Sequence, residues 1–268
     1  MSVSPEPASG EQPTAPNAAR IYNYTLGGTH YTPADQAAAE YMFSLLPSTR
    51  KWVGMLRAFL QQAARQLRAE GFTHFVDFAS GLPTEDHIHP ILPDARIVYS
   101  DIDPETYELA TKMVAGLPNV LYLQHDVRDA RGLLESEVVR DFLGGERKVA
   151  IGLSGITVFL NPDELTRLFH DLYDWAAPGS KLYITYETKE AGRTTPQLEQ
   201  FLAMFSQAGA PFWFYTQEEC VALSAPWRLP LGGLVPLQRF LGLPDDYITE
   251  ADREGVGLEF YAALLEKP

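Results

Sequence analysis

The chain has 268 residues, a formal net charge of −14 and a hydrophobic content of 46%, with 21% charged residues. These values are ordinary for a globular protein with one large α/β domain. The acidic balance disfavours nucleic acid as a partner, because gripping phosphates requires clustered Lys and Arg. The richest basic stretch is scattered and typical of a solvated helix face: Arg50, Lys51, Arg57, Arg65 and Arg68.

The start of the chain is rich in Ser, Pro, Ala and Glu and has neither a basic segment nor an apolar one. This composition predicts a disordered tail over residues 1–16 and no signal peptide. No run approaches 18 apolar residues, so we expect no membrane span and no membrane partner. Cys220 is the only cysteine, which excludes an internal disulfide, and we expect it to be a buried apolar residue. The expected location is cytoplasmic, and a homodimer is possible.

Residues 17–71 follow a helical pattern. The clearest helix opens at Pro47-Ser48, and its apolar residues recur at steps of three and four up to Gly71, which stands where a C-terminal cap belongs. We expect residues 17–71 to form an N-terminal helical cap on a cofactor-binding domain that spans residues 72–268.

From residue 72 onward, short apolar runs alternate with helical stretches. The expected strands are 75–78, 96–100, 120–124, 148–153, 181–187, 211–215 and 258–265, and the expected helices are 104–115, 133–142, 162–176 and 195–208. This alternation predicts parallel strands joined by right-handed crossovers. The last two strands are separated by the Pro/Gly-rich residues 225–246, which predicts an antiparallel edge. The predicted fold is α/β: a doubly wound, mostly parallel, seven-stranded sheet of Rossmann-like type with an antiparallel edge strand, plus N-terminal helices.

Ligands of doubly wound sheets bind beyond the carboxyl ends of the strands. The first strand is followed by a turn of small residues at 79–81. Asp101 follows the second strand, 20 residues beyond Gly81, which is the spacing at which an acidic residue meets ribose hydroxyls in nucleotide-binding units. Asp126 and Val127 follow the third strand, where they could hold an adenine amino group and its face. Asp101 could instead cap the next helix, although Asp103 is better placed as that cap.

The turn suits S-adenosylmethionine better than a dinucleotide. A dinucleotide needs several glycines near its pyrophosphate, whereas this turn has only Gly81, and Pro83 removes an amide donor that a phosphate would use. S-adenosylmethionine carries no phosphate but keeps the adenosine. We therefore expect S-adenosyl-L-methionine as the cofactor.

Three blocks of sequence resemble a family of S-adenosylmethionine-dependent methyltransferases long described as a domain of unknown function. Residues 19–28 are similar to the family's A-R-[IV]-Y-D-Y-x-L-G-G, residues 80–89 to its G-L-P-T-x-D-N-V-H loop, and residues 98–104 with 126–129 form the third block. The resemblance extends from about Pro16 to the C-terminus and implies a Rossmann-like methyltransferase.

The resemblance also implies positions for the cofactor. The methionine portion would lie over Ala79, Gly81 and Leu82, which belong to one strand-and-turn segment with Asp77 and Ser80. Asp101 would hold the ribose, while Ile102, Asp126 and Val127 would hold the adenine. The N-terminal block would fold over the cofactor, with Arg20 or Tyr24 near its carboxylate. Two further residues complete the predicted cofactor set: Gly27 in that block, and Ser154 after the fourth strand.

The acceptor side departs from the family pattern. Val158 and the pair Tyr186-Glu187 stand where the family often has histidines, and Thr29-His30-Tyr31 replaces a polar pair after Gly28. A general base is required only if the acceptor is protonated at the working pH. The candidate catalytic residues are His30, Tyr31, Tyr186 and Glu187. Packing roles for the two tyrosines and a solvated strand end for Glu187 remain open.

Two other patterns, a pair of histidines and an aromatic run, have structural explanations. His87 and His89 lie near two acids, but residues two apart on a helix point in different directions, so no metal site is expected. Residues 212–215 are aromatic and are expected to be core and edge strand, with an aromatic acceptor pocket as the alternative.

The predicted function is methyl transfer from S-adenosylmethionine to a small-molecule acceptor, at oxygen, nitrogen or carbon. Two alternatives stay open. The enzyme could use the cofactor for cyclisation or cleavage, or the protein could be a non-catalytic regulator that binds it.

Overall fold

A computed structural model describes residues 15–189, 194–207 and 211–268. Its strands form one sheet in the order β3-β2-β1-β4-β5-β7-β6. They are β1 (His74–Asp77), β2 (Arg96–Asp101), β3 (Val120–Gln124), β4 (Ala150–Leu153), β5 (Lys181–Thr188), β6 (Val235–Pro236) and β7 (Glu259–Glu266). The first five strands are parallel, and β7 pairs antiparallel with both β5 and β6. The predicted doubly wound, mostly parallel sheet with an antiparallel edge is confirmed.

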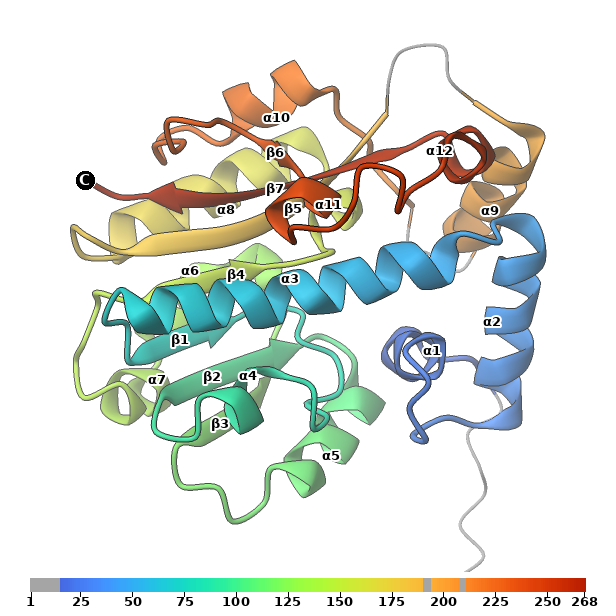
Figure 1. Ribbon diagram of the computed structural model, residues 1–268. Coiled ribbons are helices and arrows are strands. Elements are labelled where there is room, and N and C mark those ends of the chain that lie inside the picture. Colours follow the sequence, from blue (N-terminus) through green and yellow to red (C-terminus); the bar gives the residue numbers. More distant parts are fainter. Residues whose placement is uncertain (1–14, 190–193, 208–210) are drawn as a thin grey trace, which may run out of the picture.

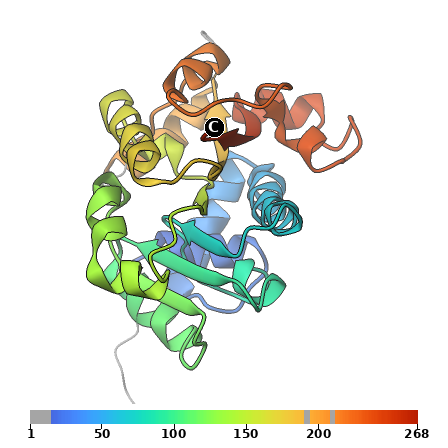
Figure 2. The same cartoon turned by 90° about the vertical axis from the view of Figure 1, so that its left-hand side faces the viewer.

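Helices cover both faces of this sheet (Figures 1 and 2). The α-helices are α1 (Ala18–Thr25), α2 (Pro33–Leu45), α3 (Thr49–Ala69), α4 (Ile88–Ile91), α5 (Pro104–Met113), α6 (Ala130–Glu135), α7 (Glu137–Phe142), α8 (Pro162–Trp175), α9 (Pro196–Gln207), α10 (Gln217–Leu223), α11 (Leu237–Phe240) and α12 (Glu250–Val256). Two short 3₁₀ turns are η1 (Val127–Asp129) and η2 (Thr157–Phe159). The first hydrophobic core lies under α3, α4 and α5, and the second under α6, α7, α8 and α10.

The N-terminal helices take two different positions. Figure 1 shows α1 and α2 beyond the carboxyl ends of β1 and β2, whereas α3 runs along the sheet. The apolar stripe of α3 lies in the first core, where Trp52 stacks on Phe260 of β7 with ring centroids 4.1 Å apart. Thr32 and Asp35 form a capping box that starts α2, with Pro33 at its first position. The order of the strands reverses between β1 and β4, so α1 lies over the edge where ligands of such sheets bind.

The expected strand at residues 211–215 is wrong. Tyr215 makes only an isolated bridge with Thr188, and the strand beside β7 is instead β6. Phe212 of this segment packs on helix α9, where its ring centroid lies 4.6 Å from that of Phe205 and 5.8 Å from that of Phe201. The edge of β7 is paired with β6. Phe212, a residue of strand type, therefore packs in a side-chain cluster with α9.

The expected helix at residues 133–142 is broken in two. Ser136 has extended ψ (145°), ends α6, and accepts a hydrogen bond from the Val139 amide as the N-cap of α7. Helices α10 and α12 were not predicted, although each begins with a capping box: Thr-x-x-Glu for α10 and Thr-x-x-Asp for α12. Asp103 caps α5 as expected, and Cys220 is fully buried as expected.

Two expectations concern the ends of the molecule. The predicted disordered tail lies outside the described residues except for Ala15 and Pro16. Among the helices that are described, none combines the length and apolarity needed to cross a bilayer.

Candidate cofactor and acceptor site

The turn after β1 has an unusual backbone. Ala79 and Gly81 both have positive φ, 50° and 61°. A non-glycine residue in this region is strained, and such strain concentrates at ligand-binding sites. The amide of Ser80 donates to the Ser100 carbonyl (2.8 Å), and the Tyr122 hydroxyl donates to the Gly81 carbonyl (2.7 Å). The turn is therefore fixed against β2 and β3, with its backbone exposed toward α1.

Asp101 connects this turn to the end of β2. One carboxylate oxygen accepts the Gly81 amide (3.1 Å), and the other accepts the Asp103 amide (3.0 Å). Burial raises the pKa of Asp101 above its ordinary value. Gly81 and Asp101, which are 20 residues apart in the sequence, are thus in direct contact, and each carboxylate oxygen keeps a lone pair for a ligand hydroxyl.

The predicted adenine residues differ in accessibility. Ile102 is 55% exposed, so its side chain is accessible to a flat ring of a ligand. The side chain of Asp126 is 37% exposed and accepts the Arg128 amide (2.9 Å). Val127 is buried in the second core, so only its backbone faces this edge. Ser154 is partly buried just after β4. The strained turn, the buried acid and the exposed isoleucine fit an adenosine-containing ligand.

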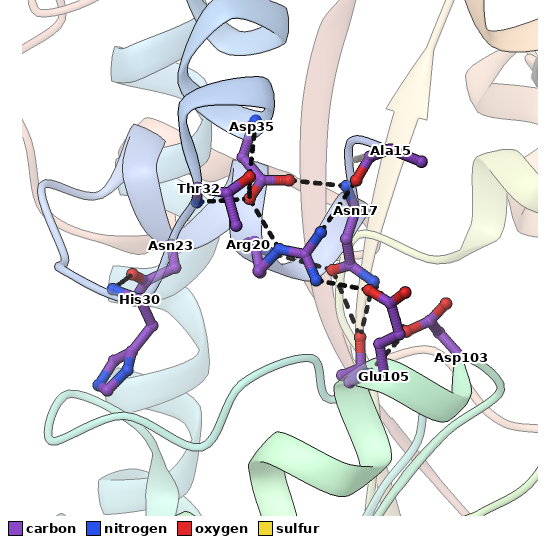
Figure 3. Close-up of polar contacts among 10 residues, drawn as sticks. Ala15, Asn17, Arg20, Asn23, His30, Thr32, Asp35, Asp103 and Glu105 are labelled. Atoms are coloured by element: carbon purple, nitrogen blue, oxygen red, sulfur yellow. Dashed lines mark hydrogen bonds and ion pairs between the residues drawn. The ribbon is translucent and has the colours of Figure 1, made fainter. Parts of the chain in front are cut away.

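Each of the three guanidinium nitrogens of Arg20 donates a hydrogen bond within the protein, as Figure 3 shows. Its Nε donates to Asp35 (2.7 Å), its Nη1 to Glu105 (2.7 Å) and its Nη2 to the Ala15 carbonyl (3.0 Å). Asp35 is fully buried, so Arg20 neutralises it and ties α1 to both α2 and α5. The tip of Arg20 therefore holds the N-terminal helices in place.

Tyr24 faces another direction. Its hydroxyl donates to Glu40, its ring stacks near Phe43, and the Arg50 guanidinium lies 5.5 Å from the ring centroid. Tyr31 is 38% exposed and packs edge-on against Tyr24, with ring centroids 4.7 Å apart. Both tyrosines thus belong to one aromatic cluster on α1 and α2.

The end of the N-terminal block is a tight loop. A Cβ on Gly28 would lie 2.3 Å from the Asn23 side chain, which accepts the His30 amide (2.8 Å), so only glycine fits there. Gly27 is exposed with φ of 83°. His30 is exposed and lines a pocket between this loop and Asp86.

A buried polar cluster lies beside the turn, and of its members only Asp77 was among the predicted site residues. Asp77 accepts the Tyr183 hydroxyl (2.7 Å), and burial raises the pKa of Asp77 to about 6. The Nδ1 of His87 lies 3.0 Å from the Tyr99 hydroxyl and accepts the Ile88 amide, while burial lowers the pKa of His87. The imidazole is therefore neutral, with its proton on Nε2, 3.3 Å from the Ser80 carbonyl.

Glu187 and Tyr186 point to opposite faces of β5, as alternation along a strand requires. Tyr186 is fully buried in the second core, where its hydroxyl bonds to Ser224 (2.8 Å). Glu187 is 6% exposed on the face that carries α3, and its carboxyl accepts hydrogen bonds from Thr157 (3.3 Å) and Thr185 (3.4 Å). Burial raises the pKa of Glu187 to about 7. A solvated strand end, one of the two interpretations left open for it, is wrong.

A second missed feature is Arg57 of α3. It is 8% exposed, so its assignment to a solvated helix face is wrong. Its guanidinium lies 5.4 Å from the ring centroid of Tyr22, and its Nε is 3.6 Å from an Asp86 oxygen. The available signal was one basic residue between the apolar positions Leu56 and Phe59 of a helix.

Aromatic residues flank Glu187's partner Thr157. The Phe159 ring lies 4.7 Å from that of Phe212, and the Trp213 amide donates to the Val158 carbonyl (2.6 Å). Segment 211–214 therefore packs directly on η2. Within the described part of the chain, no group of three or more His, Cys, Asp or Glu side chains is arranged to hold a metal ion.

Comparisons with known proteins agree on one family. The family model described as S-adenosyl methyltransferase matches residues 7–267. A structure described as a methyltransferase of Thermobifida fusca shares 29% identity, with 94% of this chain and 95% of that chain covered and a TM-score of 0.78. A DUF574-family protein of Streptomyces avermitilis shares 24% identity over 95% and 98% of the two chains, with a TM-score of 0.80. No curated protein sequence matches the chain.

A more distant structure matches in fold. Magnesium protoporphyrin IX methyltransferase of Synechocystis, solved with bound S-adenosylhomocysteine, shares 10% identity over 92% and 93% of the two chains, with a TM-score of 0.52.

Proposed function

The chain belongs to the S-adenosyl methyltransferase family and uses S-adenosylmethionine as its methyl donor, and from that premise we propose that it methylates a small molecule whose acceptor atom loses a proton to Glu187. The single observation that carries this proposal is the buried carboxyl of Glu187 at the end of β5, held by two threonine hydroxyls.

The acid–base chemistry of Glu187 supports its role as general base. A base is most effective when its pKa lies near the working pH, and burial raises the pKa of Glu187 to about 7. Near neutral pH, a substantial fraction of the carboxyl is therefore ionised and ready to accept a proton. The Thr185 hydroxyl lies 3.4 Å from one carboxyl oxygen, and the Thr157 hydroxyl lies 3.3 Å from the other and 3.2 Å from the Thr185 carbonyl. An acceptor O–H or N–H would give its proton to this carboxylate as the new bond to the methyl carbon forms.

The cofactor supplies an electrophilic methyl group on a sulfonium. The protein residues that would hold it are the strained turn 79–81, the carboxylate of Asp101 and the exposed face of Ile102, with Asp126 at the adenine edge. Holding two reactants in the right geometry supplies much of the acceleration in a transfer of this kind.

The surroundings of Thr157 favour an acceptor with an apolar ring. The rings of Phe159 and Phe212 pack against each other close to Thr157, the hydroxyl partner of Glu187. Aromatic walls hold flat apolar ligands in well-defined orientations. The net charge of −14 disfavours nucleic acid as the acceptor.

The test uses S-adenosylmethionine, an extract of small metabolites, and mass spectrometry. We expect a product heavier by one methyl group, formed together with S-adenosylhomocysteine. With that product as the readout, E187Q should lower kcat by about 100-fold or more, which is the range for removing a general base. The Y186F variant is the matched control, because it removes a polar group from the adjacent residue on the opposite face.

The outcome also separates the other uses of the cofactor. Breakdown of S-adenosylmethionine without an acceptor would favour cyclisation or cleavage, and binding without any turnover would favour a regulator. An E187Q variant with full activity would refute the role of Glu187.

A further inference from the structure

Arg57 is a buried cation that the protein satisfies only in part. Its residue is 8% exposed, and its Nη1 has no hydrogen-bond partner among residues 15–189, 194–207 and 211–268. Its nearest acid, Asp86, lies 3.6 Å from Nε, which is too long for a normal hydrogen bond. Burying a charged donor without a partner is costly, so such a group in a native structure calls for an explanation.

Arg57 lies beside the turn 79–81. Ala19 and Tyr22 are three residues apart on α1 and therefore share one face of that helix. A Cβ on Gly81 would lie 3.6 Å from Ala19, while the Tyr22 ring lies under the Arg57 guanidinium. Burial lowers the pKa of His87 most, and the positive charge of Arg57 lowers it further. The Nε2 of His87 lies 3.3 Å from the Ser80 carbonyl in the turn. Helix α1 thus brings the guanidinium and the turn to the same place.

The acids near Arg57 are engaged elsewhere. Asp77 accepts the Tyr183 hydroxyl (2.7 Å), and Asp86 accepts the Thr84 hydroxyl. Arg20, the cation that the family resemblance suggested for this task, already donates through all three of its guanidinium nitrogens. Arg57 is therefore the buried cation of this region that retains an unused donor.

We propose that Arg57 binds the carboxylate of the methionine portion of S-adenosylmethionine. This inference rests on the proposed function, because it assumes that the cofactor lies over the turn 79–81. A guanidinium and a carboxylate form the strongest kind of charge-assisted hydrogen bond, and the planar fork of arginine matches the two oxygens. The same chemistry would also recognise a carboxylate on the acceptor, and the experiment separates the two sources.

The experiment compares two ligands that differ only in this carboxylate. Calorimetry measures the Kd of S-adenosylmethionine and of decarboxylated S-adenosylmethionine for the wild-type protein, R57Q and R57K. The wild type should bind the intact cofactor about 10- to 100-fold more tightly than the decarboxylated one, which is the range for a hydrogen bond to a charged group. In R57Q this ratio should fall close to 1, because both ligands then lack the partner. R57K keeps the charge but not the fork, so it should recover part of the ratio.

R50Q is the matched control, because Arg50 is also on α3 but its side chain is 47% exposed and lies over Phe43. Its ligand ratio should equal that of the wild type, and thermal unfolding of each variant verifies the fold. An unchanged ratio in R57Q would overturn the inference and assign the guanidinium to another anion, such as an acceptor carboxylate. A wild-type protein that binds neither ligand would instead refute the proposed function itself.

Discussion

Glu187, which we propose as the general base, should lower the stability of the folded protein, and E187Q tests that effect. The ordinary pKa of a glutamate is 4.5, and burial raises that of Glu187 to about 7. The folded state holds the proton more tightly than the unfolded state does. The carboxyl therefore destabilises the folded protein most when it is ionised in both states. Its penalty is therefore absent below pH 4.5, grows between pH 4.5 and 7, and is complete above pH 7.

The size of the effect follows from that difference in pKa. At 1.36 kcal/mol per pH unit, the span from 4.5 to about 7 corresponds to about 3 kcal/mol at pH 8. Glutamine has the same shape and no charge, so E187Q should be more stable than the wild type by up to about 3 kcal/mol at pH 8. At pH 4.5 the two proteins should be about equally stable.

Urea denaturation at pH 4.5, 6, 7 and 8 measures this difference directly. Y186F is again the control, because its difference from the wild type should not vary over this range. The reasoning would be refuted if the stability gained by E187Q were the same at every pH. A variant that is more stable yet inactive would show that burial of this carboxyl is maintained for function.

Three further predictions follow from contacts in the structure. D101N should weaken S-adenosylhomocysteine binding by about 10-fold or more in calorimetry. The amide would replace a carboxylate oxygen that accepts the Gly81 amide and is proposed to accept a ribose hydroxyl. Unchanged affinity would contradict that role. G152A should lower the free energy of unfolding by about 2 to 3 kcal/mol, because a Cβ there would lie 2.2 Å from both Asp77 and the Tyr183 hydroxyl. A variant that melts at the same temperature as the wild type would argue against this packing. R20M should lower the free energy of unfolding by about 3 kcal/mol, because it leaves the fully buried carboxylate of Asp35 without its cation. R50Q, which removes the exposed pair with Glu40 and the contact with the Phe43 ring, should change it by less than about 1 kcal/mol in the same denaturation experiment.

The fold was largely predictable because local signals and the sheet pattern agree. The strands β1 to β5 alternate with helices whose caps are visible in the sequence, such as Asp103 before Pro104. The place of Asp101 at the end of β2, 20 residues beyond Gly81, was likewise predictable, because a βαβ unit fixes that spacing, whereas its hydrogen bond with the Gly81 amide was not predicted. The aromatic segment 211–215 was not, because its residues suit both a strand and a side-chain cluster. In the structure β6 pairs with the edge of β7, and Phe212 of segment 211–215 packs on Phe205 instead. Strand propensity alone does not distinguish these two arrangements.

The burial of Glu187 could not be predicted from its position at a strand end. The sequence shows a glutamate two residues from a lysine, which is typical of solvent exposure. In the structure, Trp52 of α3 stacks on Phe260, and Phe260 is the partner of Glu187 in the β5–β7 ladder. Burial of this carboxyl thus depends on a helix more than 100 residues earlier in the chain, a kind of information that local periodicity does not contain.

Arg20 and Arg57 differ in how far the folded chain satisfies their guanidinium groups. Arg20 stands in the most recognisable block of the sequence, but Asp35, Glu105 and the Ala15 carbonyl already use its nitrogens. Arg57 stands in an ordinary amphipathic helix, yet folding buries it and leaves its Nη1 without a partner in the described chain. A satisfied cation gains little from a ligand, whereas an unsatisfied buried one gains the full strength of a charge-assisted bond. The difference between these two arginines is therefore a property of the folded chain, and it is the reason for proposing Arg57 as the anion-binding residue.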